Sequence, residues 1–252
     1  RTLGHRTLHP GPLEVPSAAD YFKVMDDASV IVDPDRRAAL ITEGARKVAL
    51  ELGGEPVIDD ELLSEVTSLC EHPSAFLGRF EDRYRSLPKE VLVTAMRHHQ
   101  RYFPVEDAQG NILPGFVGVR DGHPSHGMET VRSGNEWVLR ARLEDAEFFF
   151  EQDRKVSLEA RLPELAGVRF LRNSGTMLDK AGRMERLARV ISPALQHRSA
   201  VSSPETGSQE RFDADVAARA AKLAKADLVT AMVREFPELE GIMGWRYGEL
   251  EG

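Results

Sequence analysis

Residues 97–103 place two arginines beside two aromatic side chains, where a predicted helix ends and a predicted strand begins. Guanidinium groups hold phosphate oxygens and aromatic rings stack on nucleobases, so this composition could bind RNA. Arg97 and Arg101 would contact phosphate, with His99 and Tyr102 positioned around them. The pattern fits equally well a structural role, in which the aromatic side chains lie in the core and the arginines are solvated.

A second cationic segment lies between residues 161 and 198. Eight Lys and Arg residues face three acids there, which gives +5 in a chain whose formal net charge is −8. Lys180, Arg183 and Arg186 fall at steps of three, continued by Arg189, so they share a stripe of one helix. Because an acidic protein repels polyanions at long range, RNA binding would depend on such a local basic surface. A solvated helix face is the equal alternative.

Histidine and cysteine spacing offers no metal centre and no nucleophile. The neighbouring His98 and His99 diverge by ~100° on a helix and cannot chelate one ion together. His123 and His126 lie in a Gly- and Pro-containing loop with no carboxylate at ligand spacing. Cys70, the single cysteine, falls on the apolar face of a predicted helix, which favours a buried structural thiol. We therefore predict no catalytic residue and no metal ligand.

The composition is that of a globular protein, since 41% of the 252 residues are hydrophobic and 29% are charged. The length exceeds the ~150 residues of an average domain, so two domains are expected. No stretch nears the ~18 consecutive apolar residues of a membrane span, and a signal-peptide core is missing. A single cysteine allows no internal disulfide, which favours a cytoplasmic location. Because the sequence begins at Arg1, we expect it to be part of a longer chain.

The first half of the chain alternates helices with strands. Apolar spacing and capping residues predict four helices, one buried strand and one hairpin. In chain order they are the helices 21–25, 34–52 and 60–69, the strand 75–80, the helix 88–99 and the hairpin 102–119. This alternation indicates a mixed α+β domain.

Helical spacing dominates the second half. Apolar residues recur on one helix face over 139–150 and on another over 177–195. The Ser-, Pro- and Gly-containing stretch 199–209 predicts an exposed loop. A last long helix is expected from residue 213 or 215 to 236, where Pro237 ends it. The second half is therefore predicted to be all-α.

Several long motifs, in order along nearly the whole chain, closely resemble a known family. They are GHR at 4–6, LPKEVLVTAMRHHQRYFPV at 87–105, GNEWVLRARLEDAEFF at 134–149, AKADLVT at 224–230, and EFPEL with GIMG between 235 and 244. The family is the β subunit of bacterial heterotetrameric glycyl-tRNA synthetase.

The resemblance implies a role in attaching glycine to tRNA(Gly), with ATP and Mg²⁺ used by a separate α subunit and no cofactor in this region. The partners it implies are that α subunit and tRNA(Gly), without a membrane. Residues 1–150 would form an α+β editing-type domain, similar to one in the phenylalanyl-tRNA synthetase β chain, and residues 151–252 the start of an all-α HD-type domain. The expected tRNA-binding residues are Arg97, His99, Arg101, Tyr102, Lys180, Arg183 and Arg186.

Two hydrolytic activities are suggested by these domain types, and neither is expected here. A working HD domain holds metal with a His-Asp pair, but Ala226 precedes Asp227 in this sequence. Glycine is the smallest amino acid, so a synthetic pocket excludes larger competitors by size and needs editing less. The alternatives are a metal-dependent HD-type phosphohydrolase and a pure scaffold for the α subunit.

Overall fold

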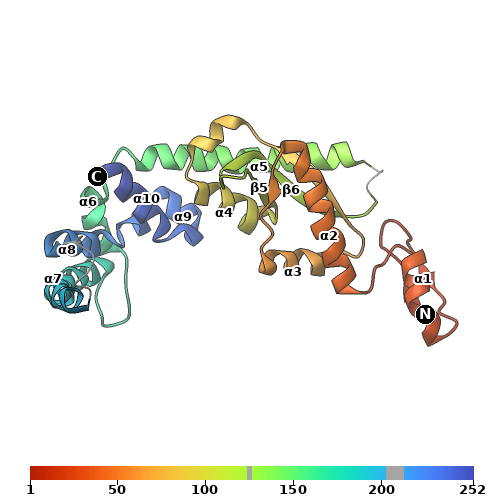
Figure 1. Cartoon of the computed structure of the whole chain (residues 1–252), viewed down its shortest axis with the longest axis horizontal. Helices are drawn as coiled ribbons and strands as arrows, with labels where there is room; N and C mark the ends of the chain where they lie inside the picture. Colours follow the sequence, from red (N-terminus) through yellow and green to blue (C-terminus); the bar gives the residue numbers. More distant parts are fainter. Residues whose placement is uncertain (124–126, 203–212) are drawn as a thin grey trace. The chain divides into compact units, whose positions relative to one another are not determined.

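A computed structural model describes residues 1–123, 127–202 and 213–252 (Figure 1). The chain divides into two compact units, Arg1–Asp145 and Ala146–Gly252. Unit 1 combines helices with antiparallel strands, whereas the described part of unit 2 is helical apart from one isolated β-bridge. The mixed α+β class is confirmed. Over the same ranges, no helix is long and apolar enough to cross a membrane.

The first three helices of unit 1 lie where the sequence predicts them. They are α1 (Tyr21–Asp27), α2 (Pro34–Ala49) and α3 (Asp60–Leu69). The side chain of Asp33 accepts a backbone N–H in the first turn of α2, and Asp59 does the same for α3. These caps stabilise helix ends whose N–H groups would otherwise lack partners.

The strands of unit 1 form two antiparallel sheets. The smaller sheet pairs β1 with β2, and the larger has the order β3-β5-β6-β4. The strands are β1 (Thr2–Leu3), β2 (Pro12–Leu13), β3 (Glu55–Pro56), β4 (Pro73–Arg79), β5 (Phe103–Glu106) and β6 (Ile112–Asp121). The predicted strand and the predicted hairpin are confirmed as β4 and the β5–β6 pair.

Two aromatic rings of the larger sheet lie over glycines of the neighbouring strand. Phe76 is paired with Gly118, and Gly78 with Phe116, in the register of β4 and β6. A Cβ atom at Gly78 would come within 2.2 Å of the Phe116 ring, and one at Gly118 within 2.3 Å of the Phe76 ring. The two rings meet edge to face, with centroids 6.4 Å apart. This packing ties the register of the two strands to their glycines.

The core of unit 1 lies between the larger sheet and helices α2 and α3. Ile41 and Ala45 of α2, Val66 of α3, and Phe103 and Val117 of the sheet are almost fully buried. Burial of each large apolar side chain contributes about 1.5–3 kcal/mol relative to exposure. Because Val66 of α3 and Phe103 of β5 share this core, α3 is held near β5.

Two longer helices complete unit 1. Helix α4 (Lys89–Gln100) ends at Arg101, whose φ of 58° is left-handed and turns the chain into β5. Helix α5 (Met128–Asp153) contains the boundary between the two units. The apolar face predicted over 139–150 is confirmed, because its four members are almost completely buried.

In the described part of unit 2, the chain continues from the end of α5 through further α-helices joined in part by short 3-10 turns. They are α6 (Leu158–Arg161), α7 (Met177–Ser202), α8 (Ala214–Leu223), α9 (Ala231–Glu235) and α10 (Ile242–Glu251). Because α7 extends to Ser202, the loop expected over 199–209 is wrong for its first four residues. The remainder of that loop, like His126, lies outside the described residues.

The long helix predicted from residue 213 or 215 to 236 is wrong beyond its first ten residues. Its start is confirmed, because Asp213 accepts N–H bonds in the first turn of α8. The chain then breaks at Asp227 and Thr230, and the Thr230 side chain caps α9. Side chains that bond to backbone N–H groups compete with a continuous helix, and sequence periodicity does not show this competition.

The predicted core face of α7 is buried only at its start. Met177 and Ala181 are buried, but Ile191 is 50% exposed and Leu195 46%. The buried part packs against α8 and against the segment that precedes α7. The basic residues of α7 lie on these same early turns.

A buried carboxylate fixes the core of unit 2. Asp153 accepts the backbone N–H groups of Ala231 and Met232 at 2.9 and 2.8 Å, and the Tyr247 hydroxyl at 3.1 Å. Arg161 lies 3.3 Å from it, and both side chains are almost fully buried. Asp153 therefore joins the end of α5 to α6, α9 and α10.

Candidate nucleic-acid interface

Both arginines at the end of α4 are paired with carboxylates of α3. Arg97 donates to Asp59 Oδ1 at 2.6 Å and to Glu61 Oε2 at 3.2 Å. Arg101 Nε donates to Glu65 Oε1 at 2.5 Å. Because a phosphate would have to displace these partners, the ion pairs compete with the phosphate contact that the sequence predicts for the two arginines.

The neighbouring aromatic side chains are parts of the core. Tyr102 is 4% exposed, its ring stacks on Phe116 with centroids 4.2 Å apart, and its hydroxyl donates to Asn135 Oδ1 at 2.5 Å. Burial raises the pKa of Tyr102 to about 12. His99 is half-buried in the last turn of α4. Of the two interpretations of residues 97–103, this arrangement favours the structural one, because Tyr102 offers no open face to a base.

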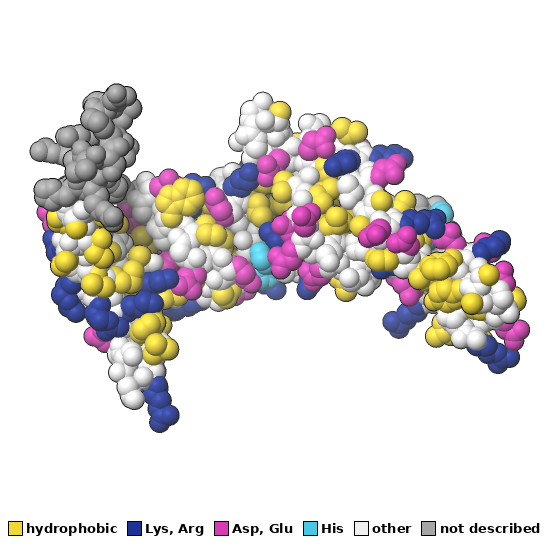
Figure 2. Space-filling view, turned by 60° about the horizontal axis from the view of Figure 1, so that its bottom comes forward, with side chains coloured by type: hydrophobic (Ala, Val, Ile, Leu, Met, Phe, Trp, Pro, Cys, Tyr) yellow, Lys and Arg dark blue, Asp and Glu magenta, His cyan; other side chains and the backbone are white. Residues whose placement is uncertain are grey.

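The basic residues of α7 have a different environment. Lys180 Nζ lies 4.1 Å from the ring centroid of Phe170, a cation–π contact. Arg183 donates to the carbonyl oxygen of Ser174 at 3.3 Å. Within the part of the chain that the structure describes, neither Arg183 nor Arg186 forms an ion pair, and Arg186 forms no hydrogen bond. Figure 2 shows dark-blue side chains gathered over α7 and α8 of unit 2.

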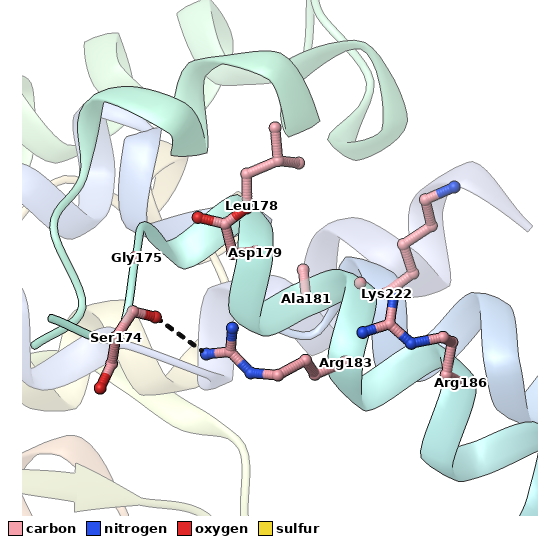
Figure 3. Close-up of a pocket in the computed structure, with 9 residues that line it drawn as sticks. Ser174, Gly175, Leu178, Asp179, Ala181, Arg183, Arg186 and Lys222 are labelled. Carbon is pink, nitrogen blue, oxygen red and sulfur yellow. Dashed lines mark hydrogen bonds between the residues drawn. The ribbon is translucent and has the colours of Figure 1, made fainter.

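Arg183 and Arg186 line a pocket of about 480 Å³ between the start of α7 and α8 (Figure 3). Both guanidinium groups extend along α7 toward the Ser174–Gly175 turn in that view. The lining residues are Ser174, Gly175, Leu178, Asp179, Ala181, Gly182, Arg183, Arg186 and Lys222. Sequence spacing did not find Lys222, because it enters from α8 and only the fold brings it to α7.

The acidic groups near this pocket are engaged elsewhere. Asp179 accepts the backbone N–H and the hydroxyl of Thr176, and these bonds, with a smaller contribution from the charge of Arg183, lower the pKa of Asp179. Glu185 is 3.5 Å from Arg189 and 3.6 Å from Lys222. The pocket therefore has two guanidinium groups and no carboxylate bound to either.

Comparison with known proteins identifies the family. The profile of one family, described as "Glycyl-tRNA synthetase beta subunit", matches residues 1–252. The chain belongs to this family. It is 46% identical over 252 residues to the glycine–tRNA ligase beta subunit of Moorella thermoacetica, and 50% over 246 residues to that of Desulforudis audaxviator. The matches cover 100% and 98% of this chain but 34% of each relative, so the chain spans about a third of their length.

A third relative gives the same result. The glycine–tRNA ligase beta subunit of Synechocystis is 43% identical over 249 residues, which cover 99% of this chain and 33% of that protein. The resemblance found in the sequence motifs is therefore confirmed. Both units of the chain lie within the matched region of the glycyl-tRNA synthetase beta family.

The GHR motif of this family member contributes to the one group with metal-ligand spacing in the described ranges. Atoms of His5, Glu71 and Asp121 lie within 4.8 Å of one another. However, His5 Nδ1 accepts the backbone N–H groups of Thr7 and Leu8, both at 3.2 Å. The neutral ring must then carry its proton on Nε2, which lies 3.1 Å from Asp121 Oδ1. A metal ligand needs the opposite tautomer, so the group is better suited to hydrogen bonding.

Cys70 is buried at the end of α3, as predicted. Burial raises the pKa of its thiol to about 11. Because the thiolate is the nucleophilic form, Cys70 is suited to packing rather than to covalent catalysis.

The carboxylate of Asp227 is used as a helix cap in this glycyl-tRNA synthetase beta chain. Its Oδ2 accepts the backbone N–H groups of Gly241 and Gly244 at 2.6 and 3.1 Å, at the start of α10. Burial raises the pKa of Asp227, partly offset by these two bonds. Ala226 beside it is fully buried and brings no ligand atom. The pair therefore lacks the imidazole that an HD metal site needs, and one oxygen of its carboxylate is already bonded to the backbone of α10.

Proposed function

We propose that this region serves the β subunit of a glycyl-tRNA synthetase in attaching glycine to tRNA(Gly). In this proposal a separate α subunit binds ATP and Mg²⁺ and activates glycine, and the β chain assembles with it in the cytoplasm. The observation that carries the proposal is the family match over the whole of this chain. This region supplies no catalytic group.

The contribution of this region is contact with the phosphates of tRNA through α7. Lys180, Arg183 and Arg186 are the contact residues, and they are supported by the absence of ion pairs at the two arginines within the described residues. A cation without a protein carboxylate releases only water and small ions when it binds phosphate, so binding costs no internal ion pair. Arg97 and Arg101 are not part of this contact, because α3 already supplies their partners.

At the level of fold, we propose that unit 1 is an editing-type domain like that of the phenylalanyl-tRNA synthetase β chain and that unit 2 is part of an HD-type domain. The antiparallel sheet covered by helices in unit 1 and the helical unit 2 support this assignment. Neither performs hydrolysis. For unit 2 the reason is that Asp227 caps α10, and for unit 1 that glycine makes editing unnecessary.

The second candidate is a scaffold that contacts only the α subunit. It is supported by exposed apolar side chains on the two helices that also carry the basic residues. They are Leu187, Val190, Ile191 and Leu195 of α7 and Val216 of α8. Exposed apolar groups of this kind are typical of surfaces that bind another protein.

Charge reversal in the complete ligase separates the two candidates. The substitutions Lys180→Glu, Arg183→Glu and Arg186→Glu are introduced together into the full-length β subunit, which is combined with its α subunit. Filter binding of tRNA(Gly) across a salt series should show weaker binding by tenfold or more, with a reduced salt slope. Glycylation should show a raised KM for tRNA at an unchanged kcat.

The matched control reverses Arg46 and Lys47, two exposed cations of α2 with no ion pair among the described residues. These changes should leave tRNA affinity and salt slope unaltered. If the α7 variant binds tRNA(Gly) normally but loses the α subunit, the scaffold is correct and the RNA contact is rejected.

A further inference from the structure

We propose that the pocket between α7 and α8 holds one phosphate group of the RNA backbone, gripped jointly by Arg183 and Arg186. The inference rests on the proposed function and deepens it. If the cations of α7 acted independently, each would contact a different phosphate. In this proposal the two guanidinium groups bind the same phosphate.

The two arginines are close and similarly directed. They are three residues apart on α7, so their side chains leave the same face of the helix. Both guanidinium groups extend toward the Ser174–Gly175 turn and line one pocket (Figure 3). A phosphate bound in this pocket would interact favourably with both positive charges.

Their hydrogen-bonding capacity is mostly unused. A guanidinium group has five N–H donors. Arg183 uses one on the Ser174 carbonyl, and Arg186 uses none within the described part of the chain. Guanidinium groups form paired bonds with the oxygens of phosphate, so two of them can satisfy one group from two sides.

Lys222 prepares the pocket rather than gripping the ligand. Its amine points away from the two guanidinium groups in Figure 3 and lies 3.6 Å from Glu185 Oε2. Arg189 approaches the other oxygen of Glu185 at 3.5 Å. Together they neutralise the acid nearest to Arg186 along the helix, which keeps the pocket positive. Lys222 is therefore a positioning residue.

The size and position of the pocket fit a chain of nucleotides. A volume of about 480 Å³ exceeds what one phosphate fills, so the sugars on either side can be accommodated. The N-terminus of α7 does not supply a rival anion site, because Thr176 and Asp179 already cap it. In this proposal the two arginine side chains supply the charge that binds the ligand, in a lining that also contains Asp179 and Lys222.

The number of phosphates can be counted from the salt dependence of binding. In the full-length β subunit with its α subunit, Arg186→Gln and the double change Arg183→Gln with Arg186→Gln are compared by filter binding of tRNA(Gly). Each lost phosphate contact lowers the salt slope by about 0.9. If both arginines hold one phosphate, the double variant loses about 0.9 in total, and the single variant loses no more than that.

Arg234→Gln is the matched control. Arg234 is exposed on α9, belongs to the same unit, and has no ion pair among the described residues, so the charge change is the same. It should leave both affinity and slope unaltered. Thermal unfolding of all variants should coincide, because none of the three arginines holds an ion pair to lose.

The outcomes distinguish this inference from the function on which it rests. A slope loss of about 1.8 in the double variant means two separate phosphates and overturns the inference while leaving RNA contact by α7 intact. An unchanged slope in the double variant, with weak binding by the triple charge reversal, also overturns it. If the charge reversal has no effect either, the proposed RNA contact itself fails.

A second measurement identifies the source of the phosphate. Inorganic phosphate is titrated against the tRNA complex at constant ionic strength. We expect competition only at millimolar concentration, because a backbone phosphate arrives with neighbouring contacts that a free ion lacks. Micromolar binding of inorganic phosphate without RNA would show a site for a free phosphate compound and would overturn the assignment to RNA.

Discussion

The end of α4 and the pocket between α7 and α8 both place two arginines close together, yet their electrostatic states differ. Arg97 and Arg101 are each held by a carboxylate of α3, whereas Arg183 and Arg186 have no ion pair in the described residues. Spacing along the sequence is similar in the two regions. What separates them is the helix packed alongside, which is acidic in the first case and carries Lys222 in the second.

The difference shows that a count of cations does not measure the charge available to a ligand. The acids of α3 are favoured at the start of that helix by its dipole, independently of any arginine. Once the core places α3 beside α4, the ion pairs follow. The acid in the lining of the α7 pocket, Asp179, bonds to Thr176 instead, and neither arginine has an ion pair among the described residues.

The largest effect on stability is expected at the buried ion pair of Arg161 and Asp153, a third environment for an arginine in this chain. Replacement of Asp153 by Ala leaves a buried guanidinium without its carboxylate and removes the acceptor of two backbone N–H groups of α9. Loss of one partner of a buried pair costs about 3–5 kcal/mol. Urea unfolding of the full-length protein should show this loss in the transition that contains unit 2.

The matched change is Glu129→Ala, which removes the exposed partner of Arg132, 3.5 Å away on α5. Exposed pairs contribute about 0–1 kcal/mol, so this variant should unfold nearly like the parent. Equal losses in the two variants would mean that burial does not decide what an arginine pair contributes here.

A carboxylate introduced beside the arginines of the α7 pocket should form an ion pair with them, as the carboxylates of α3 do with Arg97 and Arg101. Gly182→Glu places an acid four residues before Arg186, the favourable order for a helical ion pair. Space is available, because no atom lies within 4 Å of a Cβ built at Gly182. We expect binding of tRNA(Gly) to weaken about tenfold, which corresponds to ~1.4 kcal/mol.

Gly182→Gln is the control, since it gives the same gain in helix propensity without a charge. It should bind tRNA(Gly) like the parent. Comparable weakening by both variants would point to steric blocking and would remove the electrostatic distinction between the two regions.

Substitution of Tyr102 tests whether residues 97–103 at the end of α4 have a structural role rather than an RNA-binding role. Tyr102→Phe loses the bond to Asn135 and should lower the free energy of unfolding by about 1 kcal/mol, without a change in tRNA affinity. In the parent, the pKa of about 12 exceeds the unfolded value of about 10. The stability from this shift is complete below pH 10 and is lost as the pH rises toward 12.

Absorbance of tyrosinate during an alkaline titration measures this directly. One tyrosine fewer should ionise late in the Phe variant than in the parent, because burial also raises the pKa values of Tyr84 and Tyr247. Weaker tRNA binding by Tyr102→Phe would instead show that Tyr102 contacts the RNA.

The smallest effect is expected at Arg97 and Arg101. Replacing both by Gln should lower stability by about 0.2–1 kcal/mol per pair, because the pairs are partly exposed. The salt slope of tRNA binding should stay that of the parent in the filter assay. A slope reduced by about 1.8 would show that both arginines leave their carboxylates for phosphate.

Local patterns in the sequence predicted the elements well where one interaction dominates. Asp33 and Asp59 marked helix starts, and the apolar runs of β5 and β6 marked a hairpin. The prediction failed after Leu223, where buried side-chain bonds of Asp227 and Thr230 outweigh helical periodicity.

The candidate site shows the same limit. Spacing placed Arg183 and Arg186 on one face of α7, which the structure retains. It could not show that Lys222 joins them, or that the acids near residues 97 and 101 lie within reach, because both depend on contacts between distant segments. Tyr102 was ambiguous for the same reason, since its stacking partner, Phe116, comes from another strand.

The capping of α10 by Asp227 limits how this region can evolve. A single Ala226→His exchange would put an imidazole at a fully buried position, and Oδ2 of the adjacent carboxylate would still be bonded to Gly241 and Gly244. A metal centre of this type would also require another way to cap the start of α10. Bonding of Asp227 to the start of α10 therefore makes a metal site of the HD type hard to reach by a single substitution.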